Sequence, residues 1–149
     1  MIFVTVGHTD FDALVREMDR LAPDLDDEIL MQIGRGAYEP RHARYFRYAP
    51  ALEPYMEQAD LIVCHAGLGV IVEALGLGKK VVCVPNPNTY YGHQASLAEI
   101  FSRDGHLIWC RQVEDLAQAL EAARSFTPVP YEPPPCHIHE VIRAYLRSI

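Results

Sequence analysis

A short glycine-rich turn is the part of this sequence whose residue types suggest chemistry most directly. Gly67 and Gly69 follow an apolar run that ends at His65, and a helix-like segment containing Glu73 comes next. Glycines let backbone amides approach a ligand, and a helix N-terminus offers unpaired N–H groups and partial positive charge. A diphosphate fits such a turn, and a carboxylate at Glu73 could accept two hydrogen bonds from a ribose diol. The alternative is an ordinary helix start that binds nothing.

The glycine turn differs from a simple dinucleotide-binding motif. It follows the fourth strand-like run of the chain instead of the first, and the G-x-G-x-x-G spacing is not met. The second strand-like run also lacks a terminal acidic residue, which such motifs use to hold an adenosine ribose. We therefore expect no dinucleotide, and no cofactor is predicted.

Two histidines lie at the ends of strand-like runs. His8 could contact a phosphate and tune the response of the site to pH, or it could be a solvated loop residue. His65 could donate a hydrogen bond to a ligand or to the backbone of its own loop. The cysteine and histidines at 136–139 match no standard zinc spacing, and the sequence has no Asp-x-Asp motif for Mn²⁺. No metal site is predicted.

Strand-like and helix-like segments alternate along the whole chain. Apolar runs predict strands at 2–6, 29–33, 44–48, 61–64, 81–84 and 106–110. The third run is half polar, which is typical of an edge strand. Helices are predicted at 11–21, 51–58, 92–102, 113–124 and 138–147, with another from the glycine turn to about 77. We expect Asp10 to cap the first helix and Gly78 to end the helix after the glycine turn.

This alternation predicts the α/β fold class, with a Rossmann-like parallel sheet flanked by helices. Ligands bind such sheets at the carboxyl ends of the strands, so the loops after the first, fourth and fifth strands should hold the site. A chain of 149 residues is long enough for one domain with its own core. Five prolines between 128 and 135 indicate an extended linker. We therefore expect a Rossmann-like domain at 1–126, a Pro-rich linker at 127–136 and a C-terminal helix at 137–149.

Charge and composition argue against several classes of protein. The net charge of −7 disfavours nucleic-acid binding, the apolar runs are too short to span a membrane, and no charged leader precedes the first strand. The four widely spaced cysteines are predicted to be reduced thiols of a cytosolic protein. Four arginines between 35 and 47 form a basic segment. This segment either faces an anionic ligand, a membrane surface or a partner, or is a solvated loop.

Short motifs follow one another in order over about residues 1–110. They are Val4–Gly7 with Phe11-Asp12, Gln32–Gly36, Ala59–Val63, His65–Gly67, Gly69, Glu73–Leu75, Gly78-Lys79, His93-Gln94, Leu97-Ala98 and Gly105–Leu107. This ordered series resembles the C-terminal domain of family 28 glycosyltransferases. The likeness is closer to the small catalytic subunits of two-component UDP-sugar transferases. These include a eukaryotic subunit that helps add the second N-acetylglucosamine to a dolichyl diphosphate, and bacterial exopolysaccharide subunits.

The resemblance implies a fold equivalent to the C-terminal half of a GT-B glycosyltransferase, which binds the UDP-sugar donor. By position, the diphosphate would meet Gly67 and Gly69, and the ribose would meet Glu73. His65, Leu68 and Val70 of the same turn are also expected to bind the substrate. His93 and Gln94 would contact the donor sugar. Gly7, His8 and Thr9 would line the floor of the cleft, and Arg35 would lie near its rim. Tyr90 and Tyr91 could stack on a sugar or pack against a partner.

Two positions depart from the family pattern. The family often has a small hydroxyl residue after Gly69, but this chain has Val70, so one phosphate hydrogen bond is missing or comes from backbone amides. After Gly7 the family usually has Thr-Thr, but this chain has His8-Thr9. These departures support an alternative function, a non-catalytic module that binds a nucleotide sugar and regulates another protein.

The resemblance implies the donor-binding catalytic subunit of an inverting, metal-independent hexosyltransferase. It would move a sugar from a UDP-sugar to a polyprenyl-diphosphate-linked or polysaccharide acceptor, together with a membrane-associated, acceptor-binding partner. The catalytic base is not identified: we expect it on the partner, with His8 as the candidate in this chain. The location implied is cytoplasmic and peripheral, at the inner face of the membrane through the partner. A small hydrolase is not supported, since the sequence has no nucleophile elbow or ordered triad.

Overall fold

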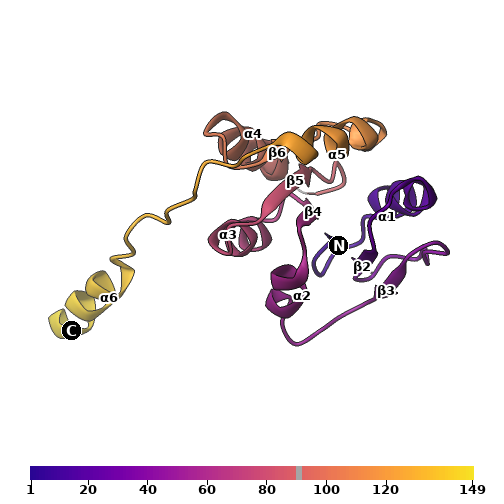
Figure 1. Ribbon diagram of the computed structural model, residues 1–149. Helices are drawn as coiled ribbons and strands as arrows, with labels where there is room; N and C mark the ends of the chain where they lie inside the picture. Colours follow the sequence, from indigo (N-terminus) through magenta and orange to yellow (C-terminus); the bar gives the residue numbers. More distant parts are fainter. Residues whose placement is uncertain (90–91) are drawn as a thin grey trace.

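A computed structural model describes residues 1–89 and 92–149; Tyr90 and Tyr91 lie outside the described residues. The described chain forms one six-stranded parallel sheet in the order β3-β2-β1-β4-β5-β6 (Figure 1). The strands are β1 (Ile2–Thr5), β2 (Ile29–Gln32), β3 (Arg44–Phe46), β4 (Leu61–His65), β5 (Lys80–Val84) and β6 (Ile108–Trp109). This is a Rossmann-like order, and the chain reverses direction across the sheet between β1 and β4. The predicted fold class and the edge position of β3 are confirmed.

Helices cover both faces of this sheet (Figure 1). They are α1 (Asp12–Leu21), α2 (Glu53–Gln58), α3 (Leu68–Gly76), α4 (His93–Arg103), α5 (Leu116–Ser125) and α6 (Ile138–Ser148), with short 3-10 helices η1 (Ala22–Asp24) and η3 (Val113–Asp115). The buried residues form two clusters. One packs α1 and α5 on the sheet, and the other packs α2, α3 and α4 on it. The sheet is therefore held rigidly between two apolar layers.

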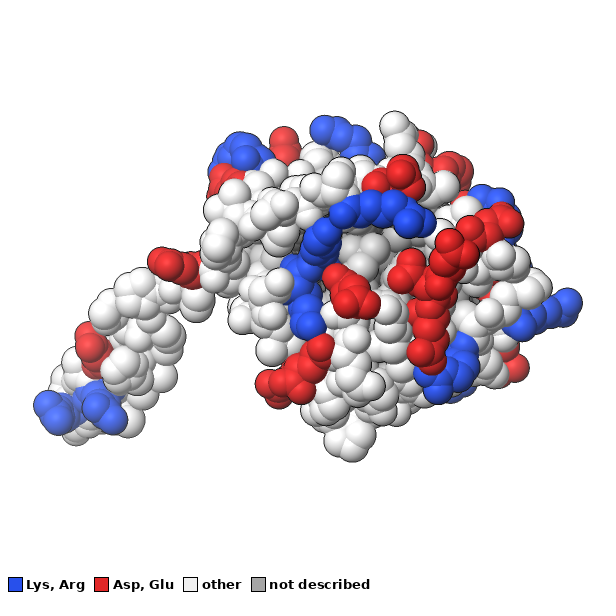
Figure 2. Space-filling model, viewed as in Figure 1, with Lys and Arg blue, Asp and Glu red and all other residues white. Residues whose placement is uncertain are grey.

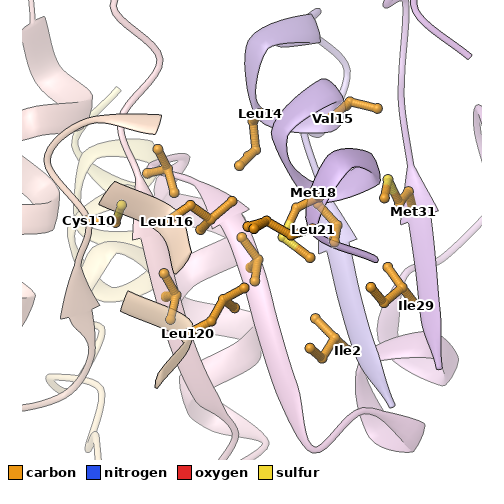
Figure 3. Close-up of a cluster of buried hydrophobic side chains, with 14 of the residues drawn as sticks. Ile2, Leu14, Val15, Met18, Leu21, Ile29, Met31, Cys110, Leu116 and Leu120 are labelled. Carbon is orange, nitrogen blue, oxygen red and sulfur yellow. The ribbon is translucent and has the colours of Figure 1, made fainter. Parts of the chain in front are cut away.

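The α1 side of the core follows directly from the helical spacing of apolar residues. Leu14, Met18 and Leu21 point from α1 toward Ile2 and the neighbouring strand residues (Figure 3). Strand residues alternate between the two clusters, since Ile2 and Val4 face α1 while Phe3 faces the other layer. Each fully buried aliphatic side chain contributes about 1.5–3 kcal/mol, so this layer fixes β1 and the loop that follows it.

The predicted helix boundaries need two corrections. Asp10 does not cap α1: the N-cap residue is Phe11, and Asp12 in the first turn uses its carboxylate to accept the amides of Ala37 and Tyr38. The carboxylate therefore holds a distant loop instead of the helix start. The end of α3 was predicted correctly. Gly78 follows the C-cap residue in the left-handed region, at φ +68°, and its N–H donates to a carbonyl of the last turn.

The C-terminal helix lies apart from the sheet, at the end of an extended segment (Figure 1). Every residue of α6 is exposed, including its apolar residues Ile138, Val141, Ile142, Tyr145 and Leu146. In residues 1–89 and 92–149, no helix is long and apolar enough to cross a membrane. The division into a domain, a linker and a terminal helix stays a prediction.

Candidate functional site

A cavity of about 630 Å³ opens at the carboxyl edge of the sheet. It lies between the loops after β1 and β3, the end of β4 and the first turns of α3. Eight of the twelve sequence-predicted site residues line it: Gly7, His8, Thr9, His65, Gly67, Gly69, Val70 and Glu73. The other four, Arg35, Leu68, His93 and Gln94, lie outside the lining. The fold therefore brings together residues that are up to 66 positions apart, from Gly7 to Glu73.

The first turn of α3 faces this cavity with its amides available. Gly67 is the N-cap residue, and among the described residues no side chain caps the helix. The first intrahelical bond runs from the N–H of Ile71 to the carbonyl of Gly67, at 3.0 Å. The amides before Ile71 therefore have no acceptor within the helix. Together with the helix dipole, they make this turn suited to an anion.

Gly69 has no steric role within the protein itself. Beyond its chain neighbours and the backbone of its own helix, a Cβ atom added at this position would meet no described atom within 4 Å. Its φ is not in the left-handed region, so an alanine would fit the backbone. Glycine inside a helix costs about 0.5–1 kcal/mol relative to alanine, and Gly69 lines the cavity. A ligand that approaches the backbone closely would account for this glycine.

The imidazole of His65 lies at the base of the cavity, beside the loop after β1. A Cβ atom added at Gly7 would lie 2.7 Å from Cε1 of His65, so the ring packs directly on that glycine. Burial lowers the pKa of His65 below its usual value, and the nearby Thr5 backbone offsets part of this effect. The ring is therefore neutral near pH 7, and it can act as a hydrogen-bonding group but not as a fixed positive charge.

Glu73 lies one turn into α3 and lines the cavity with an exposed side chain. Its carboxylate has no hydrogen bond or ion pair with any residue that the structure describes. The side chain is therefore not needed to hold the fold. It remains available for a ligand that offers hydrogen-bond donors, such as a ribose diol.

Gln94 has a role that its position in the sequence did not predict. Its Oε1 accepts the N–H of Ala66 at 3.2 Å and the N–H of Asn86 at 2.9 Å. The buried side chain of Asn86 in turn donates to the carbonyl of Asp10 at 2.9 Å. Gln94 thus ties the glycine turn to the loop after β5. Contacts of Gln94 and His93 with a donor sugar stay a prediction.

The arginines of the basic segment are mostly bonded to the protein itself. Nε of Arg35 donates to the carbonyl of His8 at 3.1 Å, which places Arg35 beside the loop after β1 but outside the cavity lining. Arg44 pairs with Glu28, and Arg47 lies 3.1 Å from Glu39. These contacts favour a structural role for Arg44 and Arg47.

Two features of the cavity were missed by the sequence analysis. The segment after β3, Tyr48–Leu52, forms one of its walls, and the rings of Tyr48 and His8 stack across the opening with centroids 6.4 Å apart. Gln32, at the end of β2, also reaches the cavity and is 2 % exposed. A polar residue ending an apolar strand was the available signal for Gln32, but residue spacing alone contained no signal for the Tyr48 wall.

A second cavity of about 640 Å³ lies at the opposite, amino edge of the sheet. Figure 2 shows basic and acidic side chains on either side of a hollow on this face. Nζ of Lys79 donates to the carbonyl of Glu57, and Nζ of Lys80 donates to the carbonyls of Ala123 and Arg124, at 2.7–3.1 Å. These lysines stabilise the carboxyl ends of α2 and α5. The described residues contain no group of three His, Cys, Asp or Glu that could hold a metal.

The strand order and an uncapped helix start at the carboxyl edge define a Rossmann-like domain with an anion-binding turn. Residues 1–143 match the glycosyltransferase family 28 C-terminal domain, and the chain belongs to this family. The sheet and its flanking helices are thus equivalent to the C-terminal half of a GT-B glycosyltransferase.

Similar proteins agree with this assignment. The UDP-N-acetylglucosamine transferase subunit ALG13 of Mus musculus is 36% identical over an alignment of 121 residues, and the match covers 72% of this chain and 10% of the mouse protein. The chain thus spans about a tenth of that relative. The crystal structure of the glycotransferase of kitacinnamycin has a TM-score of 0.66 at 25% identity, covering 83% of this chain and 34% of that one. The solution structure of ALG13 has a TM-score of 0.61 at 19% identity, covering 96% and 93%.

Proposed function

We propose that this chain is the donor-binding catalytic subunit of an inverting UDP-sugar transferase. It moves a sugar from a UDP-sugar to a polyprenyl-diphosphate-linked or polysaccharide acceptor, together with an acceptor-binding partner. The observation that carries this proposal is Gly69, a helix glycine that the protein's own packing does not require and that lines the cavity. The name of the mouse relative, a UDP-N-acetylglucosamine transferase subunit, supports the choice of donor.

The shape of the cavity supports one orientation of the donor. The diphosphate lies on the amides of the α3 start, and Glu73 accepts the ribose hydroxyls one turn further along the helix. The base then lies beyond Glu73, against the wall formed by Tyr48–Leu52. The volume of about 630 Å³ is within the range of about 300–1,000 Å³ for small-molecule sites. The sugar lies toward the loop after β5, where Gln94 bridges two backbone segments.

The chemistry assigned to this chain is stabilisation of the leaving UDP. Backbone amides and the dipole of α3 face the position where negative charge develops on the diphosphate, and they need no reorganisation during transfer. The neutral ring of His65 can add a hydrogen bond there. Deprotonation of the acceptor hydroxyl falls to the partner, with His8 at the mouth of the cavity as the candidate base in this chain.

The partner is proposed to dock on α6 and on the loop after Gly7. The exposed apolar side of α6, with Ile142 and Tyr145, has no cover in the described chain. A GT-B enzyme needs two Rossmann-like halves, and holding the acceptor against the donor contributes about 7–11 kcal/mol to lowering the barrier. We propose that the partner supplies the acceptor half and a membrane attachment. The chain would then be cytoplasmic and peripheral to the membrane.

One observation favours a second function, a regulatory module that binds nucleotide sugars without catalysis. Val70 lines the cavity at the position where the family often has a hydroxyl residue. A site with one phosphate hydrogen bond fewer could bind the donor yet transfer slowly. This function predicts donor binding with no transfer, so activity separates the two.

The experiment is a radiolabelled UDP-sugar assay with a lipid-linked acceptor. It is run with this chain, with its partner, and with the two together. The proposed function predicts transfer only by the pair. Transfer by this chain alone at the rate of the pair would contradict the two-component proposal. A pair that forms but transfers no common UDP-sugar would favour the regulatory function.

A further inference from the structure

The side-chain amide of Gln32 has all of its hydrogen-bonding capacity used by the protein. Its Oε1 accepts the hydroxyl of Thr5 at 2.6 Å and the N–H of Gly7 at 3.1 Å. Its Nε2 donates to the carbonyl of Gly7 at 2.8 Å and to the carbonyl of Arg47 at 2.7 Å. An amide can make two bonds of each kind, so no donor or acceptor of Gln32 is left for a ligand.

These four bonds join the two walls of the cavity. Gly7 begins the wall formed by the loop after β1, and Arg47 directly precedes the wall formed by Tyr48–Leu52. Gln32 holds both the N–H and the carbonyl of Gly7, whose φ is +65°. The bond to Arg47 then sets the distance between this loop and the second wall. If the side-chain amide of Gln32 were removed, the main-chain groups of Gly7 and Arg47 would lose these hydrogen bonds, which is unfavourable for buried polar groups.

The side chain of Arg47 extends this arrangement to a third segment. Its Nη1 donates to the carbonyl of Gly36 at 2.7 Å, next to Arg35, which itself bonds to the carbonyl of His8. Bonds from side chains to main-chain carbonyls thus connect the loops after β1, β2 and β3. Among the side chains that make these bonds, Gln32 is buried, and it bonds to both the loop after β1 and the loop after β3.

We propose that Gln32 is a positioning residue that holds the two walls of the cavity at the separation a nucleotide requires. The proposal rests on the proposed donor site, and it gives Gln32 no contact with the donor. Gln32 acts by fixing the backbone of Gly7 and the carbonyl of Arg47. Its loss should therefore weaken nucleotide binding beyond any general loss of stability.

The test compares Gln32→Met with a matched control, Asp19→Asn. Methionine keeps the volume of glutamine but removes all four bonds. Asp19 is equally buried, 1 % exposed, and it anchors a loop by accepting the hydroxyl of Tyr38 and the amides of Arg41 and His42. These partners lie in the far part of the loop after β2, beyond Gly36, and none of them lines the cavity or bonds to Gln32. Both variants should melt below the wild type, so a loss of stability alone cannot distinguish them.

UDP affinity, measured well below the melting temperatures, provides the distinction. We expect Gln32→Met to weaken UDP binding at least about tenfold, equivalent to about 1.4 kcal/mol, while Asp19→Asn stays within about twofold of the wild type. If Gln32→Met does not fold, Thr5→Val removes one of the four bonds, together with the longer bond of 3.3 Å from the N–H of Gly7 to Oγ1 of Thr5, and should weaken binding by a smaller factor. Unchanged UDP affinity in the folded variant, or equal weakening in the Asp19→Asn control, would overturn the proposal.

Hydrogen exchange of the Gly7 amide tests the positioning without any ligand. This amide should exchange at least about tenfold faster in Gln32→Met than in the wild type, and at the wild-type rate in Asp19→Asn, once both are compared at equal global stability. If the wild type does not bind UDP, the proposed function fails, but the exchange rates still decide whether Gln32 fixes Gly7. Unchanged exchange at Gly7 in Gln32→Met would overturn the positioning role.

Discussion

The imidazole ring of His65 occupies the space that a side chain at Gly67 would need. A Cβ atom added at Gly67 would lie 2.4 Å from Nε2 of His65, a distance that real structures do not show. The two residues are only two positions apart, and the ring fits because Gly67 has no side chain. The neighbouring Gly69 has open space beside it. Both glycines line the cavity, but Gly67 is needed to make room for the His65 ring, whereas the protein's own packing does not require Gly69.

This difference predicts opposite effects of alanine on stability. Gly67→Ala must displace His65 and should destabilise the protein by about 1–3 kcal/mol. Gly69→Ala should stabilise it by about 0.5–1 kcal/mol, because alanine favours the helix, yet it should weaken UDP binding at least about tenfold. Thermal melts and UDP titrations measure the two effects.

Gly76 offers a matched control in the same helix. It ends α3, an added Cβ atom there would also meet no described atom within 4 Å, and it lies outside the cavity lining. Gly76→Ala should therefore raise stability without changing UDP affinity. Normal UDP binding by Gly69→Ala would show that no ligand approaches this glycine.

Glu73→Ala should reduce UDP affinity while leaving the unliganded melting temperature within a few degrees of the wild type. The carboxylate is exposed and makes no hydrogen bond or ion pair with the described residues, so only a ligand depends on it. The control is Glu99→Ala, an exposed glutamate of α4 outside the cavity. A large drop in stability for Glu73→Ala would instead indicate a structural role.

The pH dependence of stability should reflect His65. Burial lowers its pKa in the folded protein below the usual 6.5. As pH falls below this value, the unfolded chain binds a proton that the folded protein does not, so the free energy of unfolding decreases. Stability should thus be greater at pH 7.5 than at pH 5, with a shallower slope in His65→Gln. Denaturant unfolding at several pH values measures this, and equal slopes would contradict it.

The cysteines should differ sharply in reactivity. Cys136 is exposed, whereas Cys64, Cys83 and Cys110 are buried, and all four are free thiols. Burial raises the pKa of Cys110 to about 11, and the adjacent Cys64 thiol together with burial raises the pKa of Cys83. A thiol reagent at pH 8 should therefore modify one cysteine in the folded protein and four in denaturant. Rapid modification of two or more in the folded protein would contradict these burial assignments.

The fold was largely predictable because apolar residues that recur on one side of a helix or strand are the residues that become buried in the core. Met18 and Leu21 are spaced to face one side of a helix, and they are buried on that side. The last strand was overestimated: Ile108–Trp109 is shorter than the predicted run, because the N–H of His106 donates to the carbonyl of Phe101 at the end of α4. The ring of His106 bonds through Nδ1 to the carbonyl of Val129. This contact joins residues 23 positions apart, and a local pattern cannot show it.

The site was predictable only in part, for a similar reason. The glycine turn and Glu73 are close in sequence, so it could be inferred that both lie at the N-terminal end of the same helix. The bridges made by Gln32 and Gln94 depend on main-chain groups 8–28 positions away, which the folded sheet brings close. Glutamine side chains carry no spacing signal for such partners, and their roles emerged only from the structure.

UDP titration of the isotope-labelled chain in EDTA, followed by backbone amide NMR, tests the donor site most directly. With a Kd of about 100 μM, UDP at about 1 mM should add about 1.4 kcal/mol to stability, a rise in melting temperature of about 3–6 °C. We expect metal-independent binding, with the largest chemical-shift changes at the amides of Gly67, Gly69 and Gly7. Binding that requires Mn²⁺, equal binding of AMP, or shifts centred on Lys79 and Lys80 at the opposite cavity would contradict it.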